Sequence, residues 1–321
     1  MLTRTEVNID PKNKKIELAD NIFTIGSCFA GNMAERLARY NQKVIQSAFG
    51  VMYNPISICN ILTGNDIGTH YTSHLGLWFC YGTHSQVHAN TQEALAMQIQ
   101  ELSSKTQVAL SMSKFIIITW GTAYVYALAD SGYIVANCHK ADNKLFTKRF
   151  LTEQEITDAF EKCHRHLTHI NPNLNIILTV SPVRHIKDTL QHNGVSKAIL
   201  RCATHAMCTK YDNVQYFPSY EIMLDDLRDY GYYKEDMIHP NEIAEKYIWK
   251  KFINTYYTDN DLEYYSDYDK ILSAINHKPF YPQSNDYQIF IKNTLDIIAK
   301  WEHKADMNEA KKYFRSKLYD K

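Results

Sequence analysis

The chain has 321 residues, of which 45% are hydrophobic and 12% aromatic, so it can bury a substantial core as one large domain or as a domain with an appendage. Its 35 basic and 35 acidic residues balance, which argues against a nucleic-acid partner or an anionic membrane surface. The polar N-terminus and the lack of a long apolar run predict a cytoplasmic location, and seven dispersed cysteines predict free thiols.

Four short β-rich runs alternate with helical patterns, and these runs read as buried parallel strands. The predicted strands cover residues 22–25, 115–119, 175–180 and 214–217. The predicted helices between them cover residues 28–40, 91–103, 152–169 and 196–211. This alternation predicts an α/β fold, a three-layer α/β/α sandwich with a mainly parallel sheet.

Two further patterns lie beside these elements. Residues 123–128 and 132–136 flank a turn over 129–131 and predict a hairpin that decorates the sheet. A helix is expected over residues 240–254, with Pro240 at its first position, where proline presets the backbone angle.

The last part of the chain is predicted to be helical and separate from the core. The acidic, tyrosine-rich stretch 259–268 reads as the end of the core, and apolar residues at helical spacing from Tyr287 to Trp301 indicate an amphipathic helix. We therefore expect a catalytic domain over residues 1–258 and a C-terminal helical appendage, packed on the core, over residues 259–321.

Candidate reacting groups follow the first predicted strand, at Gly26, Ser27 and Cys28. In open α/β sheets the ligand crevice lies beyond the carboxyl ends of the strands, and the amides of a following helix would stabilise a thiolate or an oxyanion there. The same residues also fit an ordinary strand-to-helix turn, in which Ser27 caps the helix and Cys28 is a small buried side chain.

A second candidate element lies more than two hundred residues further on, at Asp236 and His239, directly before Pro240. Their spacing of three lets the carboxylate hold the imidazole Nδ1 while Nε2 faces a nucleophile. Alone, the pair also fits a helix-capping aspartate with a histidine nearby by chance.

The order of these two motifs resembles that of the SGNH (GDSL-type) hydrolases. Within that superfamily, the hexapeptide Ile-Gly-Ser-Cys-Phe-Ala over residues 25–30 looks like the signature of the GSCFA-domain family. Further segments that look typical of this family cover residues 49–55, 121–126, 137–140, 181–185 and 217–221. The resemblance covers roughly the first 250 residues, a span that suits one large α/β domain, and it implies ester chemistry.

The resemblance leaves two nucleophiles open. An ungapped match to the superfamily's Ile-Gly-Asp-Ser-Leu places Cys28 at the nucleophile position, and a shift of one residue places Ser27 there. Near an imidazole and a helix N-terminus a thiol can ionise close to neutral pH, so Cys28 is chemically competent.

The superfamily's oxyanion hole implies an amide of the nucleophile, a glycine of a second block and an asparagine of a third. Gly50 fits the second block, whereas the third block reads Gly-Thr-Ala over 121–123, with Ala123 in place of asparagine. Thr122 or Asn54 could supply the missing donor. Equally, Thr122 could end a strand and Asn54 could start a turn.

Substrate contacts are expected after the strand over 175–180, where Arg184 and His185 reach the carboxyl edge of the sheet. Arg184 could clamp a carboxylate or phosphate, or could be structural, and His185 could bond a sugar or serve as an alternative base. Together with Tyr126 they could position an acceptor alcohol.

No metal site and no cofactor are predicted. Several histidines recur at spacings that zinc sites use, yet no HExxH or CxxC motif accompanies them. Neither a Walker A sequence nor a GxGxxG fingerprint is present, so nucleotide hydrolysis and dinucleotide redox chemistry lack support.

The sequence thus favours an ester hydrolase, an acyl or acetyl esterase, that acts on an acylated carbohydrate or a small ester. The first alternative is an O-acyltransferase in which a glycan hydroxyl replaces water. The second is a degenerate, non-catalytic module that binds a carbohydrate or acyl ligand. The oligomeric state stays open.

Overall fold

A five-stranded, all-parallel sheet forms the centre of the protein, in the order β10-β9-β6-β1-β2. The computed structural model describes residues 5–10, 12 and 14–318. The strands are β1 (Asn21–Gly26), β2 (Lys43–Gln46), β6 (Phe115–Trp120), β9 (Asn175–Val180) and β10 (Val214–Phe217). The four predicted strands are confirmed, and β2 is an additional edge strand.

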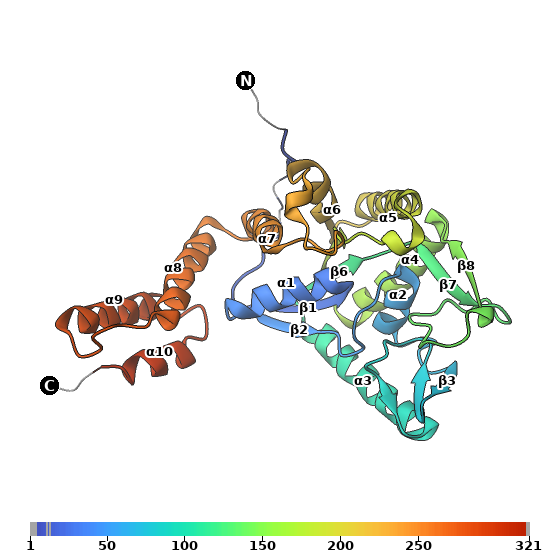
Figure 1. The fold of residues 1–321 in the computed structure, drawn as a ribbon, viewed down its shortest axis with the longest axis horizontal. Coiled ribbons are helices and arrows are strands. Elements are labelled where there is room, and N and C mark those ends of the chain that lie inside the picture. Colours follow the sequence, from blue (N-terminus) through green and yellow to red (C-terminus); the bar gives the residue numbers. More distant parts are fainter. Residues whose placement is uncertain (1–4, 11, 13, 319–321) are drawn as a thin grey trace.

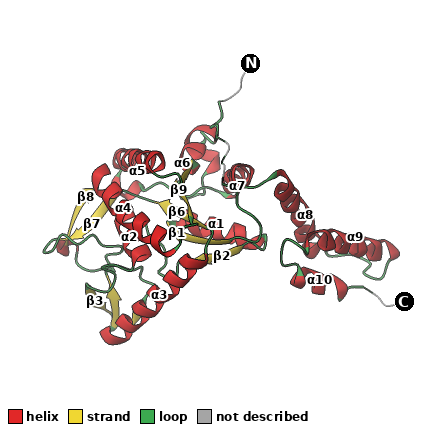
Figure 2. Cartoon of the chain, turned by 180° about the vertical axis from the view of Figure 1, so that it is seen from behind, coloured by secondary structure: helices red, strands yellow, loops and turns green. Residues whose placement is uncertain are grey.

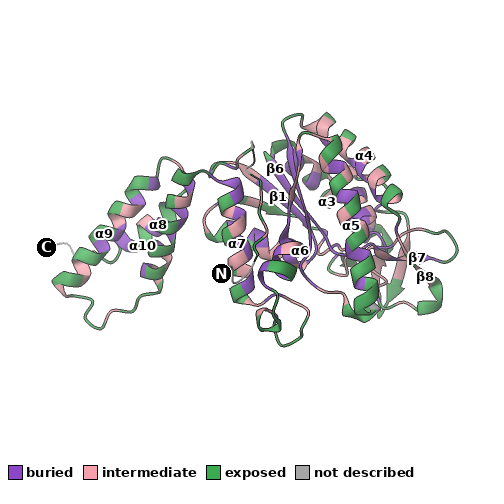
Figure 3. Ribbon diagram, turned by 90° about the horizontal axis from the view of Figure 1, so that it is seen from above, coloured by how far each residue is buried: buried purple, intermediate pink, exposed green. Residues whose placement is uncertain are grey.

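Helices cover both faces of this sheet, so the predicted three-layer sandwich is confirmed (Figure 1 and Figure 3). Alternate residues of β6 enter two apolar clusters: Ile116 and Ile118 join one, and Phe115 and Ile117 join the other. This two-sided burial explains why the strand reads as a continuous apolar run. The helices on the first face are α2 (Pro55–Thr63), α3 (Gln92–Met112), α4 (Glu153–Ile170) and α5 (Leu190–Lys210), and those on the second are α1 (Cys28–Arg39) and α7 (Glu242–Tyr256).

Two of the predicted helices are longer than expected. α3 continues to Met112 instead of ending at 103, and α5 begins at Leu190 instead of 196. At its start α5 is capped by Thr189, whose side chain accepts a hydrogen bond from the His192 amide. Asn193 of α5 also accepts a hydrogen bond from the His185 amide at 3.0 Å, so the first turn of α5 lies beside the loop that follows β9.

The predicted hairpin is confirmed only in part. Residues 132–136 turn back antiparallel to β7 (Tyr124–Leu128), with a bridge between Ala127 and Ile134 and backbone hydrogen bonds from Leu128 to Tyr133 and from Val135 to Tyr126, but the ladder partner of β7 is β8 (Phe146–Phe150). Beyond this short pairing the Ala136 amide donates to the Tyr81 carbonyl at 2.7 Å. A second small sheet, β3 (Tyr71–His74), β4 (Leu77–Cys80) and β5 (His88–Ala89), was not predicted. Figure 2 shows β3, β7 and β8 at the end of the molecule away from the C-terminal helices.

The expected start of the helix at Pro240 is also wrong. α7 begins at Glu242, because Asn241 is its N-cap and its side chain accepts a hydrogen bond from the Ala244 amide. Pro240 instead forms an isolated β-bridge with Tyr233.

The tyrosine-rich stretch over 259–268, expected to end the core, begins a helix. α8 (Asp259–Asn276) starts with a capping box between Thr258 and Asp261, and α9 (Asn285–Trp301) and α10 (Asn308–Arg315) follow. Tyr265 of α8 packs edge-on against Tyr40, with ring centroids 4.9 Å apart. The C-terminal helices therefore join the apolar cluster of α1 and α7 through α8, while α9 and α10 project away from the sheet (Figure 1). A domain boundary at residue 258 stays a prediction.

Candidate active site

A pocket of about 710 Å³ opens beyond the carboxyl ends of the central strands. Since β1 lies between β2 and β6, the chain leaves β1 toward one edge of the sheet and later returns on the other side. Such a reversal leaves a crevice at the carboxyl ends of the two strands that flank it. Seven of the predicted site residues line the pocket, namely Cys28, Asn54, Thr122, Tyr126, Arg184, His185 and His239.

Gly26 brings the candidate nucleophiles close to β6. Its φ is +137°, and a Cβ at this position would lie 2.1 Å from the Thr119 carbonyl oxygen, so only glycine fits. The next amide, that of Ser27, donates to the same oxygen at 3.0 Å. The N-terminus of α1 is thereby attached to the end of β6.

Of the two candidate nucleophiles, only Cys28 faces the pocket. The Ser27 side chain is the N-cap of α1, where its Oγ accepts a hydrogen bond from the Phe29 amide at 3.3 Å, and the residue is 2% exposed. Cys28 is the first residue of the helix and lines the pocket. The ordinary capping role considered for Ser27 thus applies to that residue, while Cys28 is left accessible.

Tyr53 is a site residue that the sequence reasoning missed. Its hydroxyl lies 3.6 Å from the Cys28 Sγ, and its ring lines the pocket. Burial, together with the hydrogen bond to Cys28, raises the pKa of Tyr53 well above its usual value, so the phenol keeps its proton. The signal was present, because Tyr53 immediately precedes Asn54 in a family-like segment.

The Cys28 backbone amide is an available hydrogen-bond donor at the start of α1. It belongs to the first turn of α1, where amides have no partner within the helix. No described residue accepts a hydrogen bond from it. Such an amide at the positive end of a helix can bind an oxyanion.

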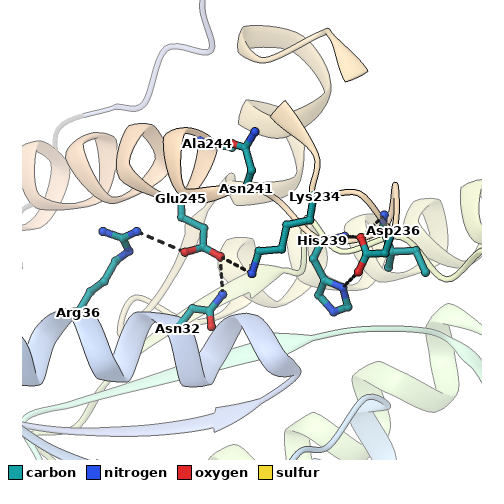
Figure 4. Close-up of polar contacts among 9 residues, drawn as sticks. Asn32, Arg36, Lys234, Asp236, His239, Asn241, Ala244 and Glu245 are labelled. Atoms are coloured by element: carbon teal, nitrogen blue, oxygen red, sulfur yellow. Dashed lines mark hydrogen bonds and ion pairs between the residues drawn. The ribbon is translucent and has the colours of Figure 1, made fainter. Parts of the chain in front are cut away.

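Asp236 and His239 form a hydrogen-bonded pair. The His239 Nδ1 lies 2.7 Å from the Asp236 Oδ2, while Oδ1 accepts from the amides of Ile238 and His239 (Figure 4). Hydrogen bonds from the His239 amide, the His239 ring and the Ile238 amide lower the pKa of Asp236 to about 2. With Nδ1 directed at the carboxylate, Nε2 is the nitrogen left for the pocket.

The His239 ring does not contact either candidate nucleophile directly. Among the described residues its hydrogen-bond partner is Asp236, and Cys28 instead bonds to Tyr53. In enzymes without substrate, catalytic hydrogen bonds are often long and close only in the complex. Cys28 and His239 nevertheless line the same pocket.

The loop that carries His239 is closed by backbone hydrogen bonds. The Lys234 amide donates to the His239 carbonyl at 2.8 Å, and the Asn241 amide donates to the Tyr232 carbonyl at 2.8 Å. The Arg184 amide donates to the Ile238 carbonyl at 3.2 Å. This loop is therefore attached both to α7 and to the segment after β9.

Glu245, which the sequence reasoning also missed, joins the two halves of the site. From α7 its carboxylate accepts from the Asn32 side chain at 2.9 Å and pairs with Arg36 at 3.3 Å, both on α1 (Figure 4). Lys234, in the His239 loop, lies 3.6 Å from the same carboxylate. Glu245 thus connects the helix that begins at Cys28 with the loop that holds His239.

Asn54 is not available as an oxyanion donor. Its side-chain oxygen caps α2 by accepting from the Ser57 amide at 2.8 Å. Its side-chain nitrogen donates to the Ser57 Oγ at 3.0 Å and to the Val135 carbonyl at 3.3 Å. Because both hydrogens of that amide are engaged, the turn-starting role considered for Asn54 is the one that the structure supports.

Thr122 is similarly engaged. Its backbone amide, like that of Gly121, donates to the Tyr53 carbonyl, at 3.0 and 2.8 Å respectively. Its hydroxyl lies 3.0 Å from the Ser196 Oγ and accepts from the Tyr124 amide at 2.9 Å. Thr122 therefore holds the end of β6 in place and offers no spare donor at the pocket.

Gly50 lies outside the pocket lining, against His84 and Gln86. Its φ is +79°, and a Cβ there would approach the His84 Cβ to 2.7 Å. This glycine is required by a tight turn and a close contact. We do not include it in the oxyanion site.

The three predicted substrate contacts come together at the pocket. The Arg184 guanidinium carbon lies 3.8 Å from the centroid of the Tyr233 ring. The His185 ring packs edge-on against Tyr53, with centroids 5.6 Å apart, and Tyr126 lies on the β7 side. Their roles toward a substrate stay predictions.

Lys197 is a buried side chain that joins the loops after β6 and β9. It is 1% exposed, and its Nζ donates to the carbonyls of Gly121 at 2.7 Å and Ser181 at 2.8 Å, directly beyond β6 and β9. Burial lowers the pKa of Lys197 to about 7. Nothing in the sequence signals this role, because a lysine in a helical pattern usually indicates a surface position.

The described residues contain no cluster of three or more His, Cys, Asp or Glu side chains that could hold a metal ion. Within the same residues, no helix is long and apolar enough to cross a membrane.

The fold and the pocket define an α/β/α sandwich protein with a Cys, His and Asp group at the carboxyl edge of a parallel sheet. The GSCFA family model matches residues 21–252, and the model of the C-terminal domain of GSCFA domain proteins matches residues 268–320. The chain therefore belongs to the GSCFA family, which confirms the resemblance drawn from residues 25–30.

Comparison with other proteins adds only distant structural similarity. No curated protein gives a significant match. A Streptococcus pneumonia protein, provisionally described as a platelet activating factor, is similar with a TM-score of 0.39 and 10% identity, over 75% of this chain and 85% of that one. An acetyl xylan esterase from the rumen bacterium Butyrivibrio proteoclasticus is similar with a TM-score of 0.37 and 14% identity, over 79% and 66%.

Proposed function

We propose that the protein hydrolyses an acyl ester, with Cys28 as the nucleophile, His239 as its base and Asp236 as the group that orients His239. The observation that carries this proposal is that Cys28 and His239, remote in sequence, line one pocket while the His239 Nδ1 is bonded to Asp236. Nucleophile, base and orienting carboxylate are the three parts of an acyl-transfer site.

The reaction follows from these groups. Nε2 of His239 takes the proton from Sγ of Cys28, and Sγ attacks the carbonyl carbon of the ester. When the intermediate collapses, the alcohol leaves with that proton, and an acyl thioester remains on Cys28. Water, deprotonated by His239, then attacks the thioester, releases the acid and returns the thiol.

We assign the oxyanion donors to the Cys28 amide and the Tyr53 hydroxyl. The amide has no partner among the described residues, and the hydroxyl already contacts Sγ at 3.6 Å. Tyr53 would thus replace the donor that the superfamily takes from asparagine and that Ala123 cannot supply. Tyr53→Phe is expected to lower kcat by about 10²- to 10³-fold, the usual effect of losing one such donor. A Tyr53→Phe protein with unchanged kcat would contradict this assignment.

Turnover of p-nitrophenyl acetate by three variants tests the nucleophile. Cys28→Ala and His239→Ala should fall to the background rate. Ser27→Ala should keep the chemistry and lose about 1 kcal/mol of stability, since it removes a helix cap. An acetyl group on the Cys28 peptide after rapid acid quench would identify the thioester. Full turnover by a folded Cys28→Ala protein would refute the proposal.

Acyl transfer to a hydroxyl is the second candidate. A pocket of about 710 Å³ is larger than an acetyl group requires, which leaves room for an alcohol acceptor beside the thioester. Adding sugars to the acetyl-ester reaction distinguishes the two, because a transferase forms acetylated sugar in preference to free acetate. Ligand binding without any acyl release would instead favour the non-catalytic module.

A further inference from the structure

The described lining of the pocket contains cationic side chains and no carboxylate. Arg184 and Lys187 both line it, and none of the described lining residues is an aspartate or a glutamate. Arg184 is half-buried and Lys187 is exposed at the pocket rim. A half-buried guanidinium without a carboxylate partner is costly, and an anionic ligand at Arg184 would reduce that cost.

Arg184 packs against two aromatic rings. Its guanidinium carbon lies 3.8 Å from the Tyr233 centroid and 5.1 Å from the Tyr230 centroid. Both rings belong to the segment that leads into the His239 loop. The guanidinium also hydrogen-bonds the Tyr233 side chain. Its remaining N–H groups are donors that suit binding of a carboxylate or phosphate.

The same arginine lies next to the acid-base group. Its backbone amide donates to the carbonyl of Ile238, the residue before His239, at 3.2 Å. Arg184, His239 and Cys28 all line one pocket. An anion bound at Arg184 would therefore share the pocket with the ester bond that is cleaved.

We propose that Arg184, assisted by Lys187, binds an anionic group of the substrate, a carboxylate or a phosphate ester, so that the preferred esters carry negative charge. That the bound anion belongs to a cleaved ester rests on the proposed function. Binding of an anion at Arg184 can be measured without turnover. A purely structural Arg184, holding only Tyr230 and Tyr233, predicts no preference between charged and neutral ligands.

Binding to the Cys28→Ala protein separates this inference from the proposed function. The probes are 4-acetamidobenzoate, its neutral methyl ester and 4-acetamidophenyl phosphate, in which an amide replaces the ester bond. Calorimetry should give at least one anion an affinity about tenfold or more above that of the methyl ester, falling as salt is added. The two anions distinguish a carboxylate site from a phosphate site.

The variants show whether Arg184 causes that preference. Arg184→Gln should remove it, and Arg184→Lys should restore it in part, because lysine keeps the charge but not the fork. Arg165→Gln, on the exposed face of α4, is the matched control and should keep it. Turnover of 4-acetoxybenzoate and its methyl ester by the wild type should show the same preference in kcat/KM.

The outcomes are separable. Anion preference in binding without any turnover would support the anion site and refute the esterase. Turnover with no anion preference would support the esterase and refute the anion site. The inference is overturned if neither anion binds better than the methyl ester, or if Arg184→Gln keeps the full preference.

Discussion

The buried Lys197 predicts how the free energy of unfolding changes with pH. Burial lowers the pKa of its ammonium group from the ordinary 10.5 to about 7, whereas its bonds to the carbonyls of Gly121 and Ser181 favour the charged form. Between pH 7 and pH 10.5 Lys197 is neutral in the folded protein and protonated in the unfolded chain, so unfolding takes up a proton. The free energy of unfolding therefore rises with pH across this range and is lowest at and below pH 7. The two pKa values give a gain of about 2 kcal/mol in the free energy of unfolding between pH 7 and pH 9.

The assay compares urea unfolding of the wild type and Lys197→Met at pH 7 and pH 9. Methionine keeps the length of the side chain but not the amine, so two carbonyl oxygens lose their partner and the variant is less stable at pH 9. The decisive quantity is the pH dependence, which should be about 2 kcal/mol smaller in Lys197→Met than in the wild type. Lys105→Met, at an exposed position of α3, should behave as the wild type does.

An equal pH dependence in the wild type and Lys197→Met would refute this reasoning. It would mean that the two carbonyl bonds compensate the ammonium fully and that Lys197 stays charged in the folded protein. Thiols and phenols also titrate near pH 9, but they are common to both proteins and cancel in the comparison.

Two further predictions concern the His239 loop. Asp236→Asn places an amide against the His239 Nδ1, so kcat/KM should fall by about 10²- to 10⁴-fold. The control Asp229→Asn, in the same loop segment, should have little effect on kcat/KM. Equal losses of kcat/KM in both variants would exclude an orienting role for Asp236. Glu245→Gln weakens the link between α1 and the loop and should lower kcat roughly tenfold with little change in thermal stability. Glu242→Gln, exposed in the same helix, is its control, and wild-type kcat in Glu245→Gln would show that the link is not needed.

The sheet was largely predictable because burial on both faces leaves a direct mark on sequence. β6 and β9 are buried throughout and read as unbroken apolar runs. β2 (Lys43–Gln46) escaped prediction, since an exposed edge strand has no such run. The hairpin over 123–136 was predicted only in part, because its second arm pairs with β7 over a single bridge before Ala136 bonds to Tyr81, which is remote in sequence.

The sequence by itself determined the family, the parallel sheet, the glycine at position 26 and the three-residue spacing of Asp236 and His239, because each depends on local backbone geometry or on a periodic pattern. The choice between Ser27 and Cys28 needed the structure, since it depends on which side chain turns back to cap α1. The partners of Tyr53, Glu245 and Lys197 were decided only by tertiary folding. Those contacts join segments far apart in the chain, and a single sequence carries no record of such pairings.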